Sequence, residues 1–413
     1  MLTVSMMLAA LVVAEPPPKP PTPLPPVHRV ATNQAETALE TPSWTAASTA
    51  VRRGLTYLAA TQSRRGGWLE ETEVTPTDQP PQRPLAAAVA VTALGLKAFA
   101  QAPTLAPNEL PRDKALSFVR AALDEDGFAS MSASGLGNYV TSSIVMGLAA
   151  AGTDTAVLQQ GVAWLTNAQW DSNEEIQPTS DWFGGAGYGK RGRPDLSNTQ
   201  FMLDALYDAG VSPDEPAVQR ALVFLSRTQN LKATNPAPWA QAGTNDGGFI
   251  YTPANHGESM ASEAVGEGRY GELMPVGTPR SLRSYGSMTY AGFKSLLYAG
   301  LGQDDPRVAA ALKWIQAHYS FGENPGLGQQ GYFYYVHAMA RALRAAGIDS
   351  IIDADGVEHD WRTDLIAALA ARQRPGGDWI NAVDRWEEGH ADLTTIYAVL
   401  ALQETLKPTS TIE

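Results

Sequence analysis

Apolar residues recur at helical spacing in two alternating kinds of segment along the chain. In the first kind, apolar positions fall at i, i+3 and i+4 and leave one polar face, which predicts an amphipathic helix. Six such segments occur, at residues 52–68, 114–128, 160–170, 220–230, 310–320 and 364–379. Aligning them places six apolar residues in one register: Leu58, Val119, Leu165, Leu225, Ile315 and Leu369. The chain is therefore expected to contain six related units.

The second kind of segment is apolar almost all round. These segments follow the first kind at residues 85–100, 142–152, 199–210, 288–301, 334–347 and 394–403. Several units place a Gly-rich turn with an aromatic residue between the two segments, as in the sequence "GGW" at residues 66–68. A helix that is apolar on every side must be buried on every side, so the second helices are expected to form an inner layer.

Six outer helices alternating with six inner helices predict an all-α fold, a closed α/α toroid of six helical hairpins around a central cavity. An open solenoid would need polar outer faces on its terminal units. The last inner segment, residues 394–403, is as apolar as the middle ones, which favours closure. The toroid domain is expected to span residues 45–407, with a short tail at 408–413.

The first 44 residues are expected to lie outside this domain. Residues 2–14 form an apolar run that is too short to cross a bilayer and ends in alanine, a pattern typical of a signal peptide over residues 1–14. We therefore expect export to the periplasm or secretion, with a cytoplasmic location as the alternative because no basic side chain precedes the run. Residues 15–44 contain a proline-rich stretch and are expected to form a stiff linker.

Charge and cysteine content narrow the classes of ligand. With 43 acidic and 30 basic side chains the net charge is −13, which disfavours nucleic acid as a partner. The absence of cysteine excludes disulfides, thiolate zinc sites and cysteine nucleophiles. The six histidines show no paired metal spacing, so we expect no metal and no cofactor. Contact with a membrane surface and the oligomeric state are left open.

The stretch "RGLTYLAATQSRRGGW" at residues 53–68 resembles the QW repeat of squalene and terpene cyclases and of protein prenyltransferase β subunits. The resemblance covers about residues 48–405 and is most specific in the first and last units. It implies an α/α toroid with an apolar central cavity. It also implies that Gln62, Trp68, Gln373 and Trp379 join successive hairpins by hydrogen bonding and stacking, which is a structural role. The zinc site of the prenyltransferases needs a cysteine, which this chain lacks.

Class II terpene cyclases carry Asp-x-Asp-Asp-Thr at the start of an inner helix, where the middle Asp protonates an alkene or epoxide. The matching residues here are Asp195, Leu196, Ser197, Asn198 and Thr199. Ser197 stands at the proton-donor position, and a hydroxyl is far too weak an acid for that step. Cyclisation by the usual route is therefore expected to be absent. Asp195 is expected to be a helix N-cap, and the alternative is that it acts as a displaced catalytic acid.

Aromatic residues concentrate where the inner helices are expected to begin, and they could hold an isoprenoid or stabilise a cation, although packing between helices would explain each of them singly. Tyr334 and Tyr397 belong to this group. The side chains expected to line a ligand cavity are Tyr139, Trp182, Tyr188, Ser197, Asn198, Tyr285, Tyr290, Tyr332, Phe333, Tyr335 and His337. His337 could equally be a hydrogen-bonded core histidine.

Two basic groups lie close to the expected cavity. Lys190, Arg191 and Arg193 precede Asp195, while Arg280 and Arg283 precede the fourth inner helix. Such a group could bind a diphosphate, and a solvated loop is the alternative. The insert at residues 252–283 is expected to cover the cavity as a lid.

Three functions are compatible with the sequence. The first is a terpene cyclase-like protein whose cavity binds a hydrophobic small molecule of the isoprenoid or triterpene type, without the usual catalysis. The second is an active cyclase or prenyl-processing enzyme that uses Asp195 as its acid. The third is a carbohydrate-active enzyme on a helical barrel, which would need a pair of carboxylates across a polar cleft.

Overall fold

The computed structural model describes residues 42–69, 86–123, 128, 135–189, 192–257 and 282–407. Four sequence expectations lie outside these residues: the signal peptide at 1–14, almost all of the linker at 15–44, the tail at 408–413, and the basic residues Lys190, Arg191 and Arg280. Most of the expected lid, residues 258–281, lies outside them as well.

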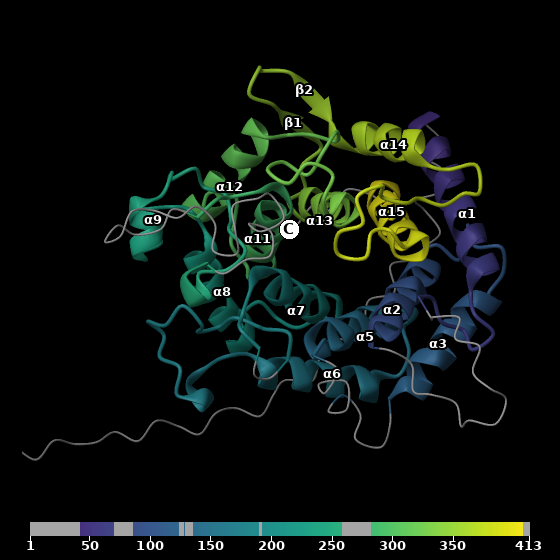
Figure 1. The fold of residues 1–413 in the computed structure, drawn as a ribbon, viewed down its shortest axis with the longest axis horizontal. Coiled ribbons are helices and arrows are strands. Elements are labelled where there is room, and N and C mark those ends of the chain that lie inside the picture. The colour runs from purple at the N-terminus through teal and green to yellow at the C-terminus, as the bar shows by residue number, and fades with distance from the viewer. Residues whose placement is uncertain are drawn as a thin grey trace, which may run out of the picture.

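In the part of the chain that the structure describes, twelve helices form two concentric layers, which agrees with the predicted fold class (Figure 1). The outer helices are α1 (Pro42–Thr61), α3 (Leu110–Ala122), α6 (Thr155–Ala168), α8 (Pro216–Thr228), α12 (Pro306–Ala317) and α14 (Trp361–Arg372). The inner helices are α2 (Ala86–Gln101), α5 (Gly137–Ala151), α7 (Leu196–Asp208), α11 (Gly286–Tyr298), α13 (Tyr332–Ala345) and α15 (Ala391–Leu406). The six predicted hairpins are therefore the six pairs of outer and inner helices.

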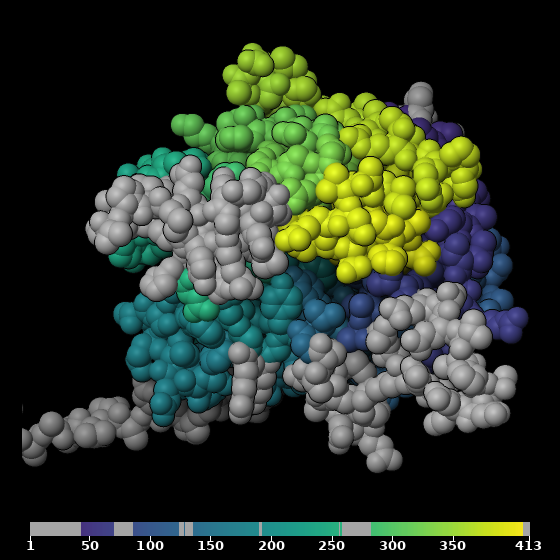
Figure 2. All heavy atoms as spheres, viewed as in Figure 1, coloured from purple at the N-terminus to yellow at the C-terminus, as the bar shows by residue number. Residues whose placement is uncertain are grey.

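The inner helices form a closed ring in the order α2, α5, α7, α11, α13, α15, with α15 packed against α2. At this seam the Gln403 side chain donates to the carbonyl oxygen of Ala98 at 2.7 Å. The outer layer closes in the same way, because α1 contacts both α14 and α15. Figure 2 shows the yellow C-terminal part of the chain in contact with the purple N-terminal part. The open solenoid is excluded.

Short elements lie in the connections between the ring helices. They are η1 (Ser172–Glu174), α9 (Pro238–Ala242), η2 (Ala254–Gly257) and the antiparallel strands β1 (Ser350–Ile352) and β2 (Glu358–Asp360). The sequence pattern missed the two strands because each has only three residues. The turn between them has Asx geometry, since Asp353 Oδ1 accepts from the amides of Asp355 and Val357.

A glutamine near the end of the outer helix joins each of four units to the next. Gln62 Nε2 donates to the carbonyl oxygen of Gly66 in its own turn at 2.9 Å and to that of Pro111 in α3 at 2.8 Å. Gln169 and Gln229, which the sequence analysis did not single out, make the same pair of bonds to their own turn and the next outer helix. One side chain thus satisfies a turn and links two hairpins.

Gln373 uses this joint to close the ring. Its Nε2 donates to Gly377 of the last turn at 2.8 Å and to Ala50 of α1 at 3.0 Å. The indole N–H groups of the tryptophans bind within their own hairpin, while the Trp379 ring also packs against Gly54 of α1 at the seam. Trp68 donates to Leu58 and Trp379 to Leu369, each at 2.8 Å.

The turn glycine is required by close packing at the same seam. Gly377 has φ +96°, and a Cβ built there would lie 2.6 Å from the carbonyl oxygen of Arg53 in α1. Only glycine can adopt this positive φ and also leave room for the carbonyl group of Arg53.

Replacing Gln373 with alanine is expected to lower the free energy of unfolding by about 2 kcal/mol, because two carbonyl groups lose their donor. Chemical denaturation of the purified variant measures this loss. Gln219→Ala is the matched control, since Gln219 is exposed and bonds only to nearby Pro213. An equal loss of unfolding free energy in the two variants would show that the hydrogen bonds of Gln373 stabilise the protein no more than an exposed glutamine does.

Candidate functional site

The six inner helices run in the same direction around the ring interior. Residues at the start of α7 contact residues at the starts of α5 and α13, and residues near the end of α7 contact residues near the ends of α2 and α13. The interior therefore has an N-terminal end, where the inner helices begin, and a C-terminal end, where they finish.

A cluster of tyrosines lies at the N-terminal end, and it consists of Tyr139, Tyr188, Tyr251, Tyr334 and Tyr397. Ser197 connects two of its members: Tyr139 donates to Ser197 Oγ at 2.8 Å, and Ser197 Oγ lies 3.0 Å from the Tyr334 hydroxyl. Because α11 separates α7 from α13 in the ring, the side chains of Ser197 and Tyr334 must meet across the interior. The position of the missing proton donor therefore does face the interior.

The hydroxyls of Tyr139, Tyr188, Tyr251 and Tyr334 each have a hydrogen-bond partner. Gln200 Nε2 donates to the Tyr334 hydroxyl at 3.0 Å, and the hydroxyls of Tyr188 and Tyr251 lie 3.0 Å apart. The ring faces are less occupied: Tyr139, Tyr251, Tyr334 and Tyr397 are half-buried, while Tyr188 is 37% exposed. The cluster thus leaves aromatic surface partly exposed at this end of the interior, while four of its five hydroxyls already have partners.

The aromatic faces form a continuous wall. The Phe201 ring packs edge-on to Tyr139 at 5.0 Å and parallel to Tyr334 at 6.3 Å, as measured between ring centroids. Tyr334 in turn contacts Tyr397 at 6.1 Å, and Tyr397 stacks on His337 at 5.4 Å. Burial, reinforced by the Arg341 charge, lowers the pKa of His337 well below its usual value, so this imidazole is neutral.

Asp195 is the N-cap of α7, as the sequence predicted. Its Oδ1 accepts from the Asn198 amide at 2.8 Å, and both its carboxylate oxygens accept from the Asn198 side chain. The carboxyl group is fully buried, and burial raises its pKa to about 6 in spite of these bonds. A group with this pKa can hold a proton near neutrality, and it adjoins both the start of α7 and Tyr251 of the tyrosine cluster.

Thr199, which matches the cyclase motif, and Asn198, which replaces its last Asp, both have structural partners. Thr199 Oγ1 donates to the Asp195 carbonyl oxygen and accepts from the Ala186 amide. In three other units a threonine hydroxyl likewise accepts a hydrogen bond from the backbone amide of the turn; these are Thr92, Thr289 and Thr395. The threonine is therefore a feature of the repeat. Asn198 points toward α5, where its Oδ1 and carbonyl oxygen accept from Asn138.

A second buried carboxyl at this end, Glu388, was not predicted. Its oxygens accept from the backbone amides of Phe333 and Tyr334 at the start of α13 and from Asn381 Nδ2. Burial raises its pKa to about 7. The residue precedes α15 in sequence but caps α13, and no local pattern reveals such a contact between units.

Charged side chains occupy the ring interior beyond the tyrosine cluster, which corrects the expectation of an apolar central cavity. This charge network consists of Lys97, Asp204, Asp208, Lys294 and Arg341. Lys294 Nζ lies 2.7 Å from Asp204 and both are almost fully buried, while Arg341 reaches Asp208 at 3.0 Å. Burial lowers the pKa of Lys294 to about 8. Such charges are tolerated in a protein interior only when they are paired.

Four predicted cavity residues lie between the two helical layers instead. Tyr332 and Tyr335 donate to the carbonyl oxygens of Phe321 and Ser320, which follow outer helix α12. Tyr290 packs against Tyr335, and Phe333 packs edge-on to Tyr332. The reason is helical geometry: successive residues turn by about 100°, so of the four consecutive aromatics only Tyr334 faces the interior.

The remaining predicted residues are near the wall or apart from it. Tyr285 is the N-cap residue of α11, and the charge of Asp195 adds to the effect of burial in raising its pKa. Trp182 packs against Trp170 at 5.0 Å in the loop after α6. Of the basic residues, Arg193 lies over the Tyr251 ring at 5.4 Å, and Arg283 is exposed. Within the described residues, no group of three or more metal-ligating side chains occurs.

Comparison with known proteins identifies the architecture. No family model matches the sequence, and no curated protein matches it. Among solved structures, the α-1,6-mannanase GH76A from a Salegentibacter species superposes with a TM-score of 0.53 at 10% identity, covering 87% of this chain and 98% of that one. The chain has the α/α toroid fold. A type II terpene cyclase from Scytonema, in complex with geranylgeranyl dihydroxybenzoate, is similar at 15% identity with a TM-score of 0.47, covering 89% and 99%. At such identities the toroid is shared, and the activity is not decided.

Glu388 is expected to make the stability of the protein depend on pH. Because the native pKa of Glu388 is raised from 4.5 to about 7, the native state binds the proton more tightly, and stability falls as the pH rises through this interval. The loss amounts to about 3 kcal/mol. Urea denaturation between pH 4.5 and 8 should give a smaller pH dependence for Glu388→Gln than for the wild type.

The neighbouring Glu387, which is exposed, provides the control. Glu387→Gln should keep the wild-type pH dependence. Asp195 shifts in the same direction, so part of the dependence should persist in Glu388→Gln. Identical slopes for Glu388→Gln and the wild type would contradict the assigned pKa.

Proposed function

We propose that the tyrosine cluster binds a hydrophobic small molecule of the isoprenoid type and that the protein does not cyclise it by the usual proton transfer. The observation that carries this proposal is the aromatic wall from Tyr139 through Phe201 and Tyr334 to Tyr397, in which the hydroxyls of Tyr139 and Tyr334 are already hydrogen-bonded. Ring faces without free donors favour an apolar, unsaturated chain over a polar ligand.

Three observations support the absence of acid-initiated chemistry. Ser197 stands where a proton donor would be needed and exchanges hydrogen bonds with Tyr139 and Tyr334. Asp195 is the nearest acid in sequence, but Asn198 occupies both its oxygens. The tyrosine hydroxyls are no substitute, because burial raises the pKa of Tyr139 and Tyr334 above the usual value.

A carbohydrate-active enzyme is the second candidate, favoured by two buried carboxyls at one end of the ring, Asp195 and Glu388. A glycosidase would use one such group as a proton donor and the other as a base or nucleophile. In this chain both carboxyls accept from backbone amides at helix starts, Asp195 from Asn198 and Glu388 from Tyr334. That use as helix caps makes the carbohydrate reading the weaker one.

Binding is tested by incubating the protein with squalene and with geranylgeranyl diphosphate, followed by native mass spectrometry and titration of the intrinsic fluorescence. Tyr334→Ala should weaken binding at least tenfold, because one aromatic face of the wall is lost. Tyr334→Phe is the matched variant, since it keeps the ring and removes the hydroxyl, and it should bind nearly as well as the wild type. Loss of binding in Tyr334→Phe, or binding of an α-mannan oligosaccharide in place of the isoprenoids, would overturn the proposal.

Catalysis is tested separately by analysing the lipid products after prolonged incubation. We expect the substrate to be recovered unchanged with the wild type and with Asp195→Asn. A cyclic product that disappears in Asp195→Asn would assign the acid role to Asp195 and would contradict the second half of the proposal.

A further inference from the structure

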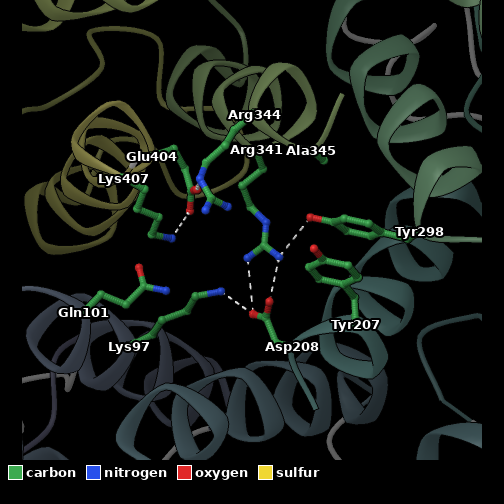
Figure 3. A pocket seen from close by; sticks show the side chains of 10 residues that line it. All are labelled: Lys97, Gln101, Tyr207, Asp208, Tyr298, Arg341, Arg344, Ala345, Glu404 and Lys407. Carbon is green, nitrogen blue, oxygen red and sulfur yellow. Dashed lines mark hydrogen bonds and ion pairs between the residues drawn. The ribbon is translucent and has the colours of Figure 1, made fainter. Parts of the chain in front are cut away.

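A pocket lies at the C-terminal end of the ring interior, opposite the tyrosine cluster. Figure 3 shows side chains from α2, α7, α11, α13 and α15 converging on it. Its charged lining consists of Lys97, Asp208, Arg341, Arg344, Glu404 and Lys407. Asp204 and Lys294 of the charge network lie between Arg341 of this pocket and the tyrosine cluster, so the pocket and the cluster are separate spaces.

Cations outnumber carboxylates around the pocket, although the protein as a whole carries a net charge of −13. Asp208 is shared by Lys97 and Arg341, and Glu404 is shared by Arg344 at 3.5 Å and Lys407 at 2.7 Å. Each carboxylate therefore faces two cations. Two positive charges are left without a matching negative charge in the lining.

The titration of the lining groups is consistent with this excess. Burial lowers the pKa of Lys97, and the neighbouring positive charges of Arg341 and Lys407 lower it further. Burial opposes ionisation of Glu404, but Lys407, Arg341 and Arg344 together hold its pKa below the usual value. Both shifts are those expected near uncompensated positive charge.

Arg344 gives the second, independent observation. Its Nε is buried, yet it has no hydrogen-bond partner among the residues that the structure describes, and its contact with Glu404 is a long ion pair. A buried guanidinium N–H without a partner costs free energy unless a ligand accepts from it. Figure 3 shows Arg344 and Lys407 on either side of Glu404, which both of them contact.

Attraction of cations to helix C-termini accounts for part of this arrangement, because several inner helices end here. That effect is worth only about 0.3–1 kcal/mol at each terminus and requires no convergence on one space. It leaves unexplained why the buried Arg344 Nε makes no hydrogen bond and has only the long ion pair with Glu404.

We propose that this pocket binds a small oxyanion that carries two negative charges, such as inorganic phosphate or the phosphate group of a soluble metabolite. Arg344 and Lys407, which are both about one quarter exposed, contact the anion directly. Lys97 and Arg341 contribute their charge from the floor, where Asp208 holds them in place. Planar, forked recognition of phosphate oxygens is the chemistry for which a guanidinium is suited.

The probes are inorganic phosphate and diphosphate, added to the full chain at constant ionic strength against a chloride background. Isothermal titration calorimetry should give saturable binding, and the melting temperature should rise with phosphate but not with chloride. Arg344→Gln and Lys407→Gln should each weaken phosphate binding about tenfold or more. Arg52→Gln makes the same change of charge at an exposed site on α1 and should bind as the wild type does.

Two further outcomes decide against the proposal. Sedimentation with vesicles of phosphatidylglycerol tests a lipid headgroup as the source of the phosphate, and binding to vesicles without binding of free phosphate would overturn the proposal of a soluble ligand. Failure of phosphate to bind beyond chloride, or equal affinity in Arg344→Gln and Arg52→Gln, would overturn the site itself. Each variant is first shown to have the circular dichroism spectrum of the wild type. If Arg344→Gln does not fold, Lys407→Gln is used in its place to test phosphate binding.

Discussion

The pairing of buried charges across the ring interior is the constraint on which the rest of the structure depends. Each inner helix is surrounded by protein, so a lysine such as Lys294 or an aspartate such as Asp204 is tolerated only because its partner projects from another inner helix. Arg341 then links Asp204 and Asp208 of α7 to α13 on the other side of α11. The ring must close for these partners to meet, and once they meet they divide the interior into two separate ends.

The sequence predicted the repeat well because the repeat is local. The register of Leu58, Leu165 and Leu369, the glutamine four residues later and the turn glycine are all visible within one unit. The structure explains them by one joint, in which Gln62 or Gln373 links its own turn to the next outer helix. Gln169 and Gln229 carried the same pattern and could have been found by extending the alignment to them.

The interior could not be predicted with the same success, because its contacts join units that are far apart in the chain. Lys97 and Asp208 meet from α2 and α7, Ser197 and Tyr334 from α7 and α13, and Glu388 precedes α15 but caps α13. Within their own helices Lys97 and Asp208 look like isolated polar exceptions among apolar residues. The four aromatics at residues 332–335 show the same limit, since their clustering is visible in the sequence but their directions depend on the orientation of α13.

The two ends of the interior are separate in space but connected through Gln200. Lys294 donates to Gln200 Oε1 at 2.7 Å, and Gln200 Nε2 donates to the Tyr334 hydroxyl at 3.0 Å. The charge network therefore orients the amide, and the amide fixes the hydroxyl of Tyr334, whose other partner is Ser197. Tyr139 also donates to Ser197 Oγ, so the side chain at position 197 is held between two tyrosines, one of which is oriented through Gln200 by the charge network.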